Sequence, residues 1–193
     1  MNQTRRQYIR ELRPHIATVT LLLVLGAVAG VLLAGHSSFA RVKISESLGG
    51  LSQFLLGFPK PLLALLIFAN NAIKTLLVIL FGMAFAIVPL AFVVVNGVAI
   101  GLVMQLSTQS RGAVNSFMAV VPHGIFELPG IVLGAGIGLM LGVKATRRLF
   151  RRAEFKPRYE LSRALRFFAN TIVPLLLIGA LTEAYITALL VGK

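Results

Sequence analysis

Apolar runs long enough to cross a lipid bilayer recur along this chain, and they constrain its fold more than any other feature. A hydrocarbon core about 30 Å thick is crossed by roughly 20 helical residues, and inside it the backbone must satisfy its own hydrogen bonds. Of the 193 residues, 57% are hydrophobic and 13% are charged, which leaves too little polar surface to cover a soluble globule. The sequence therefore predicts an all-α integral membrane protein, a bundle of about five transmembrane helices with broken or re-entrant segments.

The chain is expected to form a single polytopic membrane domain, 1–193, because no polar stretch is long enough to fold as a separate soluble domain. An amphipathic stretch at 48–58 suits either a short helix lying in the membrane interface or a loop. We predict spans at 16–35, 75–95, 97–113, 125–143 and 167–190, with a cytoplasmic basic loop at 144–166.

The apolar stretch from Pro61 to Val95 is longer than one crossing, and Asn70, Asn71 and Lys74 interrupt it. We expect residues 62–73 to form an interfacial or re-entrant piece ahead of the second span. The alternative is one crossing at 62–88.

Two short motifs predict structural turns. Asn96-Gly97 suits a tight turn between antiparallel helices, because both residue types tolerate positive φ. Pro122 and Gly124, on either side of His123, are expected to break the helix just before the fourth span.

The net charge of +13 comes from basic residues that gather beside the spans. One group, Arg5 to Arg13, precedes the first apolar run, and the other lies between Lys144 and Arg166. The positive-inside rule places both groups and the N-terminus in the cytoplasm, as expected for a multi-pass protein of the cell membrane. Attraction to acidic membrane lipids is a secondary effect, and this distribution does not suggest a nucleic-acid partner.

The sequence carries no pattern typical of catalysis. It has no Cys, no G-x-S-x-G elbow and no H-E-x-x-H pair. A lone His with two Glu is a weak basis for a zinc site. We therefore expect no catalytic residue, metal or cofactor, and no enzymatic activity.

Glycines spaced four apart predict a helix-packing face. In lipid, small residues let two backbones approach closely, and van der Waals contact then stabilises the pair. This face packs either within the chain or between copies in a homo-oligomer. The row in the fourth span is Gly130, Gly134, Gly138 and Gly142, and the same spacing recurs at Gly26/Gly30 and Gly97/Gly101.

Polar side chains are predicted to meet near the outer interface. His123 and Glu127 share a helical face with the glycine row, so Glu127 should face protein rather than lipid. An ionisable group at this depth is costly and by default marks function. It belongs either to a structural network or to a site for a partner, lipid, proton or ion. The expected members are the cationic, carboxyl and amide groups of His123, Glu127, Glu183, Lys74, Asn70 and Asn71.

The order of these motifs resembles the stage II sporulation protein M family over about Gly26 to Ala188. The namesake of that family is a multispanning scaffold that holds peptidoglycan-remodelling proteins at the septal membrane of sporulating bacteria, so the resemblance implies a scaffold-like class. The motifs that carry it are Asn70-Asn71, Asn96-Gly97, Pro122-His123-Gly124 with Glu127, the glycine-rich span, the basic loop, and Thr182-Glu183-Ala184-Tyr185-Ile186.

Two functions of different class follow. The first is a non-enzymatic membrane scaffold for membrane or envelope remodelling, with membrane lipids, further copies of the chain or other envelope proteins as partners. The second is a small transporter, channel or lipid-handling permease that uses the Glu/His site. Water access to Glu127 would favour transport, whereas a dry, paired carboxyl group would favour the scaffold.

Overall fold

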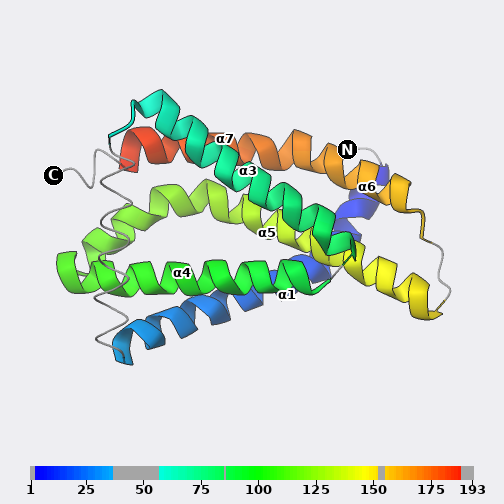
Figure 1. The fold of residues 1–193 in the computed structure, drawn as a ribbon, viewed down its shortest axis with the longest axis horizontal. Helices are drawn as coiled ribbons and strands as arrows, with labels where there is room; N and C mark the ends of the chain where they lie inside the picture. Colours follow the sequence, from blue (N-terminus) through cyan, green and yellow to red (C-terminus); the bar gives the residue numbers. More distant parts are fainter. Residues whose placement is uncertain (1–2, 37–56, 85, 152–154, 188–193) are drawn as a thin grey trace.

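The computed structural model describes residues 3–36, 57–84, 86–151 and 155–187, and every regular element within them is helical. This confirms the predicted all-α class. In chain order the elements are α1 (Gln3–His36), α3 (Lys60–Ala84), α4 (Ile87–Arg111), α5 (Ala113–Arg151), α6 (Pro157–Phe167), the π-helix η1 (Phe168–Ile172), α7 (Val173–Thr182) and the π-helix η2 (Glu183–Thr187) (Figure 1).

Five helices in the described part of the chain are long and apolar enough to cross a membrane, as predicted. The last is a continuous rod made of α6, η1, α7 and η2. Pro174, just after η1, has no N–H for the helical ladder, and a widened turn accommodates that loss. The five spans are Arg6–Gly35, Lys60–Ala84, Ile87–Gln109, Gly124–Phe150 and Pro157–Tyr185.

Helix α5 is the centre of the bundle. In an 18-residue apolar window of its span, 61% of the residues are buried, against 22–28% in the corresponding windows of the other four spans. Ile137 and Met140 of α5 pack with Leu12 of α1, Ile79 of α3 and Leu176 of α7 in one apolar cluster. The other helices therefore present one face to α5 and the opposite face to lipid.

Helix α3 corrects the predicted second span. It runs without a break from Lys60 to Ala84, and the chain turns before Ile87, so neither a re-entrant piece nor a span at 75–95 forms. The alternative crossing at 62–88 was close to the observed helix. The polar side chains at 70–74 do not end the helix, because Asn71 bonds to another helix instead of to its own backbone.

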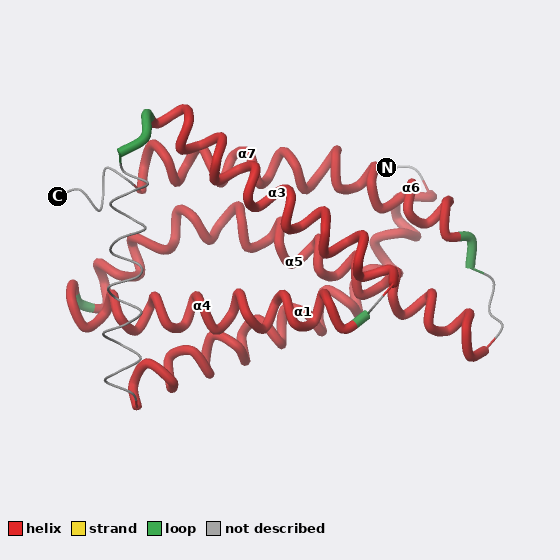
Figure 2. The backbone as a smooth tube through the Cα atoms, in the orientation of Figure 1, coloured by secondary structure: helices red, strands yellow, loops and turns green. Residues whose placement is uncertain are grey.

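The predicted turn at Asn96-Gly97 is also wrong, since both residues lie inside α4. The Asn96 amide donates to the Phe92 carbonyl one turn back, over 2.8 Å. Gly97 packs against α1, where a Cβ would lie 3.1 Å from the Gly26 Cα. Glycine is used here for close backbone approach rather than for positive φ. The described loops lie between the helices and not at this motif (Figure 2).

Pro122 and Gly124 do not end a helix either, because α5 continues through them from Ala113 to Arg151. A break at this depth would leave several backbone groups without partners in lipid, whereas one interior proline removes a single donor. Figure 1 shows α5 bending in its N-terminal part, where this motif lies. The predicted spans at 97–113 and 125–143 are therefore replaced by α4 and the longer α5.

Helical structure also occupies most of the predicted basic loop at 144–166. Helix α5 extends to Arg151, and α6 begins at Pro157, a favoured first residue of a helix. The last crossing accordingly starts earlier than the predicted 167. The stretch at 48–58 lies outside the described residues except for Gly57 and Phe58.

The glycines hold α5 against three neighbours. A Cβ on Gly130 would lie 2.7 Å from a Leu176 methyl of α7, and one on Gly138 would lie 2.6 Å from the Val78 carbonyl of α3. Gly134 and Gly142 also meet α3. On the opposite side, Gly136 contacts α1. The row described from the sequence therefore packs within the chain, divided between α7 and α3.

The two basic regions meet at one end of the bundle. The start of α1, the end of α5 and the whole of α6 lie together, opposite the start of α3 and the end of η2 (Figure 1). Lys144 of α5 forms an ion pair of 2.7 Å with Glu11 of α1. Chain order and contacts thus agree with an odd number of crossings.

Candidate functional site

A buried carboxyl group joins α3 to α5 in the interior of the bundle. The Asn71 side-chain amide donates a hydrogen bond of 2.6 Å to Oε2 of Glu127. Glu127 is only 1% exposed, while Asn71 is half-buried. Burial of a polar group is tolerated when it is hydrogen-bonded, so this contact is part of what stabilises the carboxyl group away from water.

Helix α7 closes the other side of Glu127. A Cβ on Gly179 would lie 2.6 Å from the Glu127 Cγ, so only glycine leaves room for the carboxyl side chain at this crossing. Glu127 is thus enclosed by α3 and α7, as its helical face predicted. Gly179 was not predicted as a contact of Glu127. It lies one helical turn before Glu183 of the motif Thr182-Glu183-Ala184.

Thr75 lies one turn beyond Asn71 and extends the contact between α3 and α5. It is 0% exposed, and within the described structure its hydroxyl oxygen has no hydrogen-bond partner. Its Cγ2 methyl occupies the space that a Cβ on Gly134 would need. We did not predict a role for Thr75. Its spacing of four residues from Asn71 was the only signal in the sequence.

Glu183 lies one helical turn after Gly179 in the chain and is the first residue of η2. It is partly buried, and η2 contacts α5. Because Glu127 faces Gly179 and the two helices are antiparallel, the backbone position of His123 on α5 is level with Glu183. The side chain of His123 lies outside the described part of the structure.

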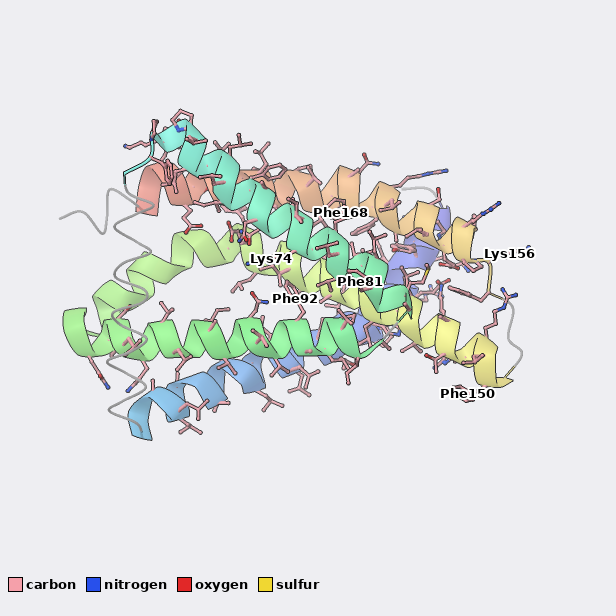
Figure 3. All side chains as sticks on the ribbon, in the orientation of Figure 1. Lys74, Phe81, Phe92, Phe150, Lys156 and Phe168 are labelled. Atoms are coloured by element: carbon pink, nitrogen blue, oxygen red, sulfur yellow. The ribbon has the colours of Figure 1, made fainter. Side chains whose placement is uncertain are left out.

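Lys74 and Asn70 do not take part in the contact between Asn71 and Glu127. Both side chains are exposed, and Lys74 forms no ion pair with any described residue. Asn71, in contrast, is half-buried and bonded to Glu127, and Figure 3 shows Lys74 on α3. Of the two asparagines predicted to serve the cluster, the structure therefore assigns Asn71 to Glu127.

A second polar cluster at the basic end was missed by the sequence reasoning. Lys144 of α5 pairs with Glu11 of α1 at 2.7 Å and with Glu160 of α6 at 3.1 Å. Arg163 pairs with Glu160 at 3.7 Å and lies over the ring of Tyr8, 4.7 Å from its centroid. These contacts tie the three helix ends at the basic end of the bundle into one unit.

The signal for this cluster was present but weak. The chain has six acidic residues, all Glu, and both Glu11 and Glu160 lie within basic regions. Their basic neighbours indicate membrane topology under the positive-inside rule, which does not identify them as ion-pair partners. Sequence distance gave no indication that Lys144 would bridge them.

The contacts of Glu127 connect three helices of the bundle, and we call them the polar joint. The carboxyl group is enclosed, bonded to an amide and packed against a glycine backbone. Within the described residues, no group of three or more His, Cys, Asp or Glu lies close enough to hold a metal ion. The hydrogen bond to Asn71 and the close contact with Gly179 can fix the mutual positions of α3, α5 and α7.

Comparison with known proteins identifies one family. A family model described as Stage II sporulation protein M matches residues 19–188, which include the last four spans in full and the first span from residue 19 on. No curated protein and no solved structure matches the chain.

Proposed function

The chain belongs to the stage II sporulation protein M family, and on that premise we propose that it is a non-enzymatic membrane scaffold for membrane or envelope remodelling. It acts in the cell membrane, with its N-terminus and basic helix ends in the cytoplasm. Its partners are membrane lipids together with further copies of the chain or other membrane and envelope proteins.

The enclosure of Glu127 is the observation that supports this proposal. A transporter or permease that used this carboxyl group would have to bring water or substrate to it. Instead, the side chain is 1% exposed and bonded to Asn71. A fixed polar joint suits a protein whose task is to hold a constant shape for others to bind.

The orientation in the membrane rests on charge. The end of α5 and the whole of α6, which carry many of the basic residues, lie with the Arg-rich start of α1 at one end of the bundle. The opposite end carries Lys60, which lies 5.8 Å from the centroid of the Tyr185 ring, a pair typical of a membrane interface. The more basic end belongs on the cytoplasmic side.

Co-purification of the native complex with its lipids retained tests the scaffold. We expect the full chain to isolate with defined partner proteins in fixed ratio, and the purified chain in vesicles to carry no ion flux above protein-free vesicles. The Glu127→Gln/Glu183→Gln variant should weaken partner recovery only as far as it lowers thermal stability. Flux that Glu127→Gln abolishes, with no partner recovered, would establish transport instead.

A further inference from the structure

Helix α3 has an exposed stripe with a charge inside it. Its members recur at helical spacing and are all exposed in the structure: Leu66, Asn70, Ile73, Lys74, Leu77 and Phe81. Figure 3 shows Lys74 and Phe81 along this helix. The face that α3 turns to α5 is a different one, formed around Asn71, Thr75 and Val78. The stripe is thus left uncovered by the described bundle.

Lys74 lies near the middle of the apolar helix α3. Helix α3 has 25 residues, a length of about 37 Å, and Lys74 is about 21 Å from its first residue and about 15 Å from its last. The hydrocarbon core of about 30 Å includes that position. An ammonium group there is costly unless it has a partner, and intramembrane charges pair with one another or mark a site.

The exposed face of α1 differs in composition from this stripe. Helix α1 also exposes a row of large apolar residues, including Leu21, Val28 and Leu32, but that row has no charged residue. Lipid alone can cover it. The α3 stripe combines an amide and an ammonium group with apolar neighbours, a composition that suits a polar contact between helices.

We propose that this α3 stripe docks a transmembrane helix of a partner protein that carries a carboxylate near its middle, paired with Lys74. The inference rests on the scaffold function and names the chemistry of its partner. A carboxylate meets the charge at the required depth, and in a low-dielectric setting the attraction between the two is strong. Leu77, Phe81 and Leu66 supply the apolar contact on either side.

Two other occupants fit less well. Lipid phosphates lie at the interface, whereas Lys74 is more than a lysine side chain away from both ends of α3 along the helix axis. A second copy placed symmetrically on the same face would bring Lys74 against its own counterpart, because a twofold contact uses identical patches. The partner is therefore a different helix with an acid.

A defined probe tests the pairing. Two leucine–alanine transmembrane peptides, one with a central Asp and one with a central Asn, are titrated into phosphatidylcholine vesicles that hold the full chain. Because the chain has no Cys, a donor dye on Gly57→Cys reports peptide binding by energy transfer. We expect the Asp peptide to bind at least about tenfold more tightly than the Asn peptide.

Variants assign that preference to Lys74. Lys74→Gln should abolish it, whereas Lys60→Gln, the same change at the outer end of α3, should retain it. Lys74→Glu should reverse the preference toward a peptide with a central Lys. Thermal stability should be nearly unchanged in Lys74→Gln, because the side chain is exposed and unpaired among the described residues.

Several results would overturn the proposal. Equal binding of the two peptides, or an Asp preference that survives in Lys74→Gln, would contradict the pairing of Lys74 with a carboxylate. Enrichment of labelled phosphatidylglycerol around wild type but not Lys74→Gln, without peptide preference, would assign the stripe to a lipid. Loss of energy transfer between two labelled copies in Lys74→Gln would assign it to self-association. If native partners still co-purify with Lys74→Gln in any of these cases, the scaffold function stands and only this docking face fails.

Discussion

Asn71 of α3 and Glu127 of α5 are hydrogen-bonded over 2.6 Å at a crossing where the carboxyl side chain is 1% exposed. The residues are separated by 56 positions, so the contact fixes the relative depth and rotation of two helices. Gly179 brings α7 onto the same carboxyl group from the other side. Three of the five spans thus share one polar joint.

Removal of the amide should weaken this joint. Asn71→Ala leaves Glu127 short of one buried donor, and we expect a loss of about 1–3 kcal/mol of unfolding free energy in detergent. Asn70→Ala is the matched control, since its amide is exposed on the neighbouring position. If the two variants melt alike, the hydrogen bond carries no net stability.

The carboxyl group can be tested in combination with that amide. Glu127→Gln keeps an oxygen that accepts from Asn71, so it should be better tolerated than Glu127→Ala, which also opens a cavity. In a double-mutant cycle, Asn71→Ala and Glu127→Ala should cost less together than the sum of the two single changes. Additive losses would contradict direct coupling between the two side chains.

The contact of Gly134 with Thr75 predicts that alanine destabilises the protein at this position but not at Gly35. Gly134→Ala should destabilise by about 1–3 kcal/mol, because its methyl group overlaps the Thr75 Cγ2. Gly35→Ala should be neutral or stabilising, since nothing lies within 4 Å of a Cβ there and alanine favours helix. Thermal unfolding in detergent measures both.

A second change separates this overlap from a general effect of alanine. Thr75→Ala removes the methyl group that a new Cβ would meet, so it should restore part of the stability lost in Gly134→Ala. Absence of any rescue would indicate that α5 and α3 are not in contact at this position. Assembly size, measured in the same samples, should stay constant because the contact is intramolecular.

Lys144 should hold the basic helix ends together. Lys144→Gln leaves Glu11 and Glu160 facing each other without the shared cation, and we expect a loss of about 1 kcal/mol, the upper end for partly exposed pairs. Salt should destabilise wild type more than the variant, because it screens the attraction. Lys156→Gln, at an exposed position, is the control. Equal salt dependence in all three proteins would argue against the cluster.

Charge distribution also predicts orientation. Single cysteines can be introduced at position 57, at the end that carries Lys60, and at positions 87 and 151, at the basic end. An impermeant thiol reagent should label position 57 in intact cells and leave the other two protected. Labelling at position 151 with protection at position 57 would reverse the assignment.

Helix boundaries show where sequence reasoning lost accuracy. The uncharged run from Thr75 to Val95 has the length and hydropathy of one span, yet it contains the end of α3, a turn and the start of α4. Hydropathy averages over such a window and cannot detect a short apolar turn. Asn96-Gly97 has the composition of a turn, but its neighbours on α1 require a glycine for packing.

The identity of partners was harder still to predict. The charge of Lys74 made it a natural partner for Glu127. Of these two α3 residues, however, Asn71 is the one that lies on the face of α3 that meets α5. Likewise, the basic residues near Glu11 and Glu160 were visible, but the bridge through Lys144 required three helix ends to meet.

The amino-acid sequence by itself determined the all-α membrane class, the five described helices that are long and apolar enough to cross a membrane, and the protein-facing position of Glu127. These properties follow from transfer of each segment into lipid and from spacing along one helix, so they need no knowledge of the neighbours. Only the tertiary structure decided where α3 and α4 divide, which asparagine meets Glu127 and which helices share the glycine row. In lipid, apolar contact with a helix and with an acyl chain are nearly equivalent, so hydropathy does not specify pairing. Close backbone approach and individual hydrogen bonds do, and both depend on the rotation and depth that packing sets.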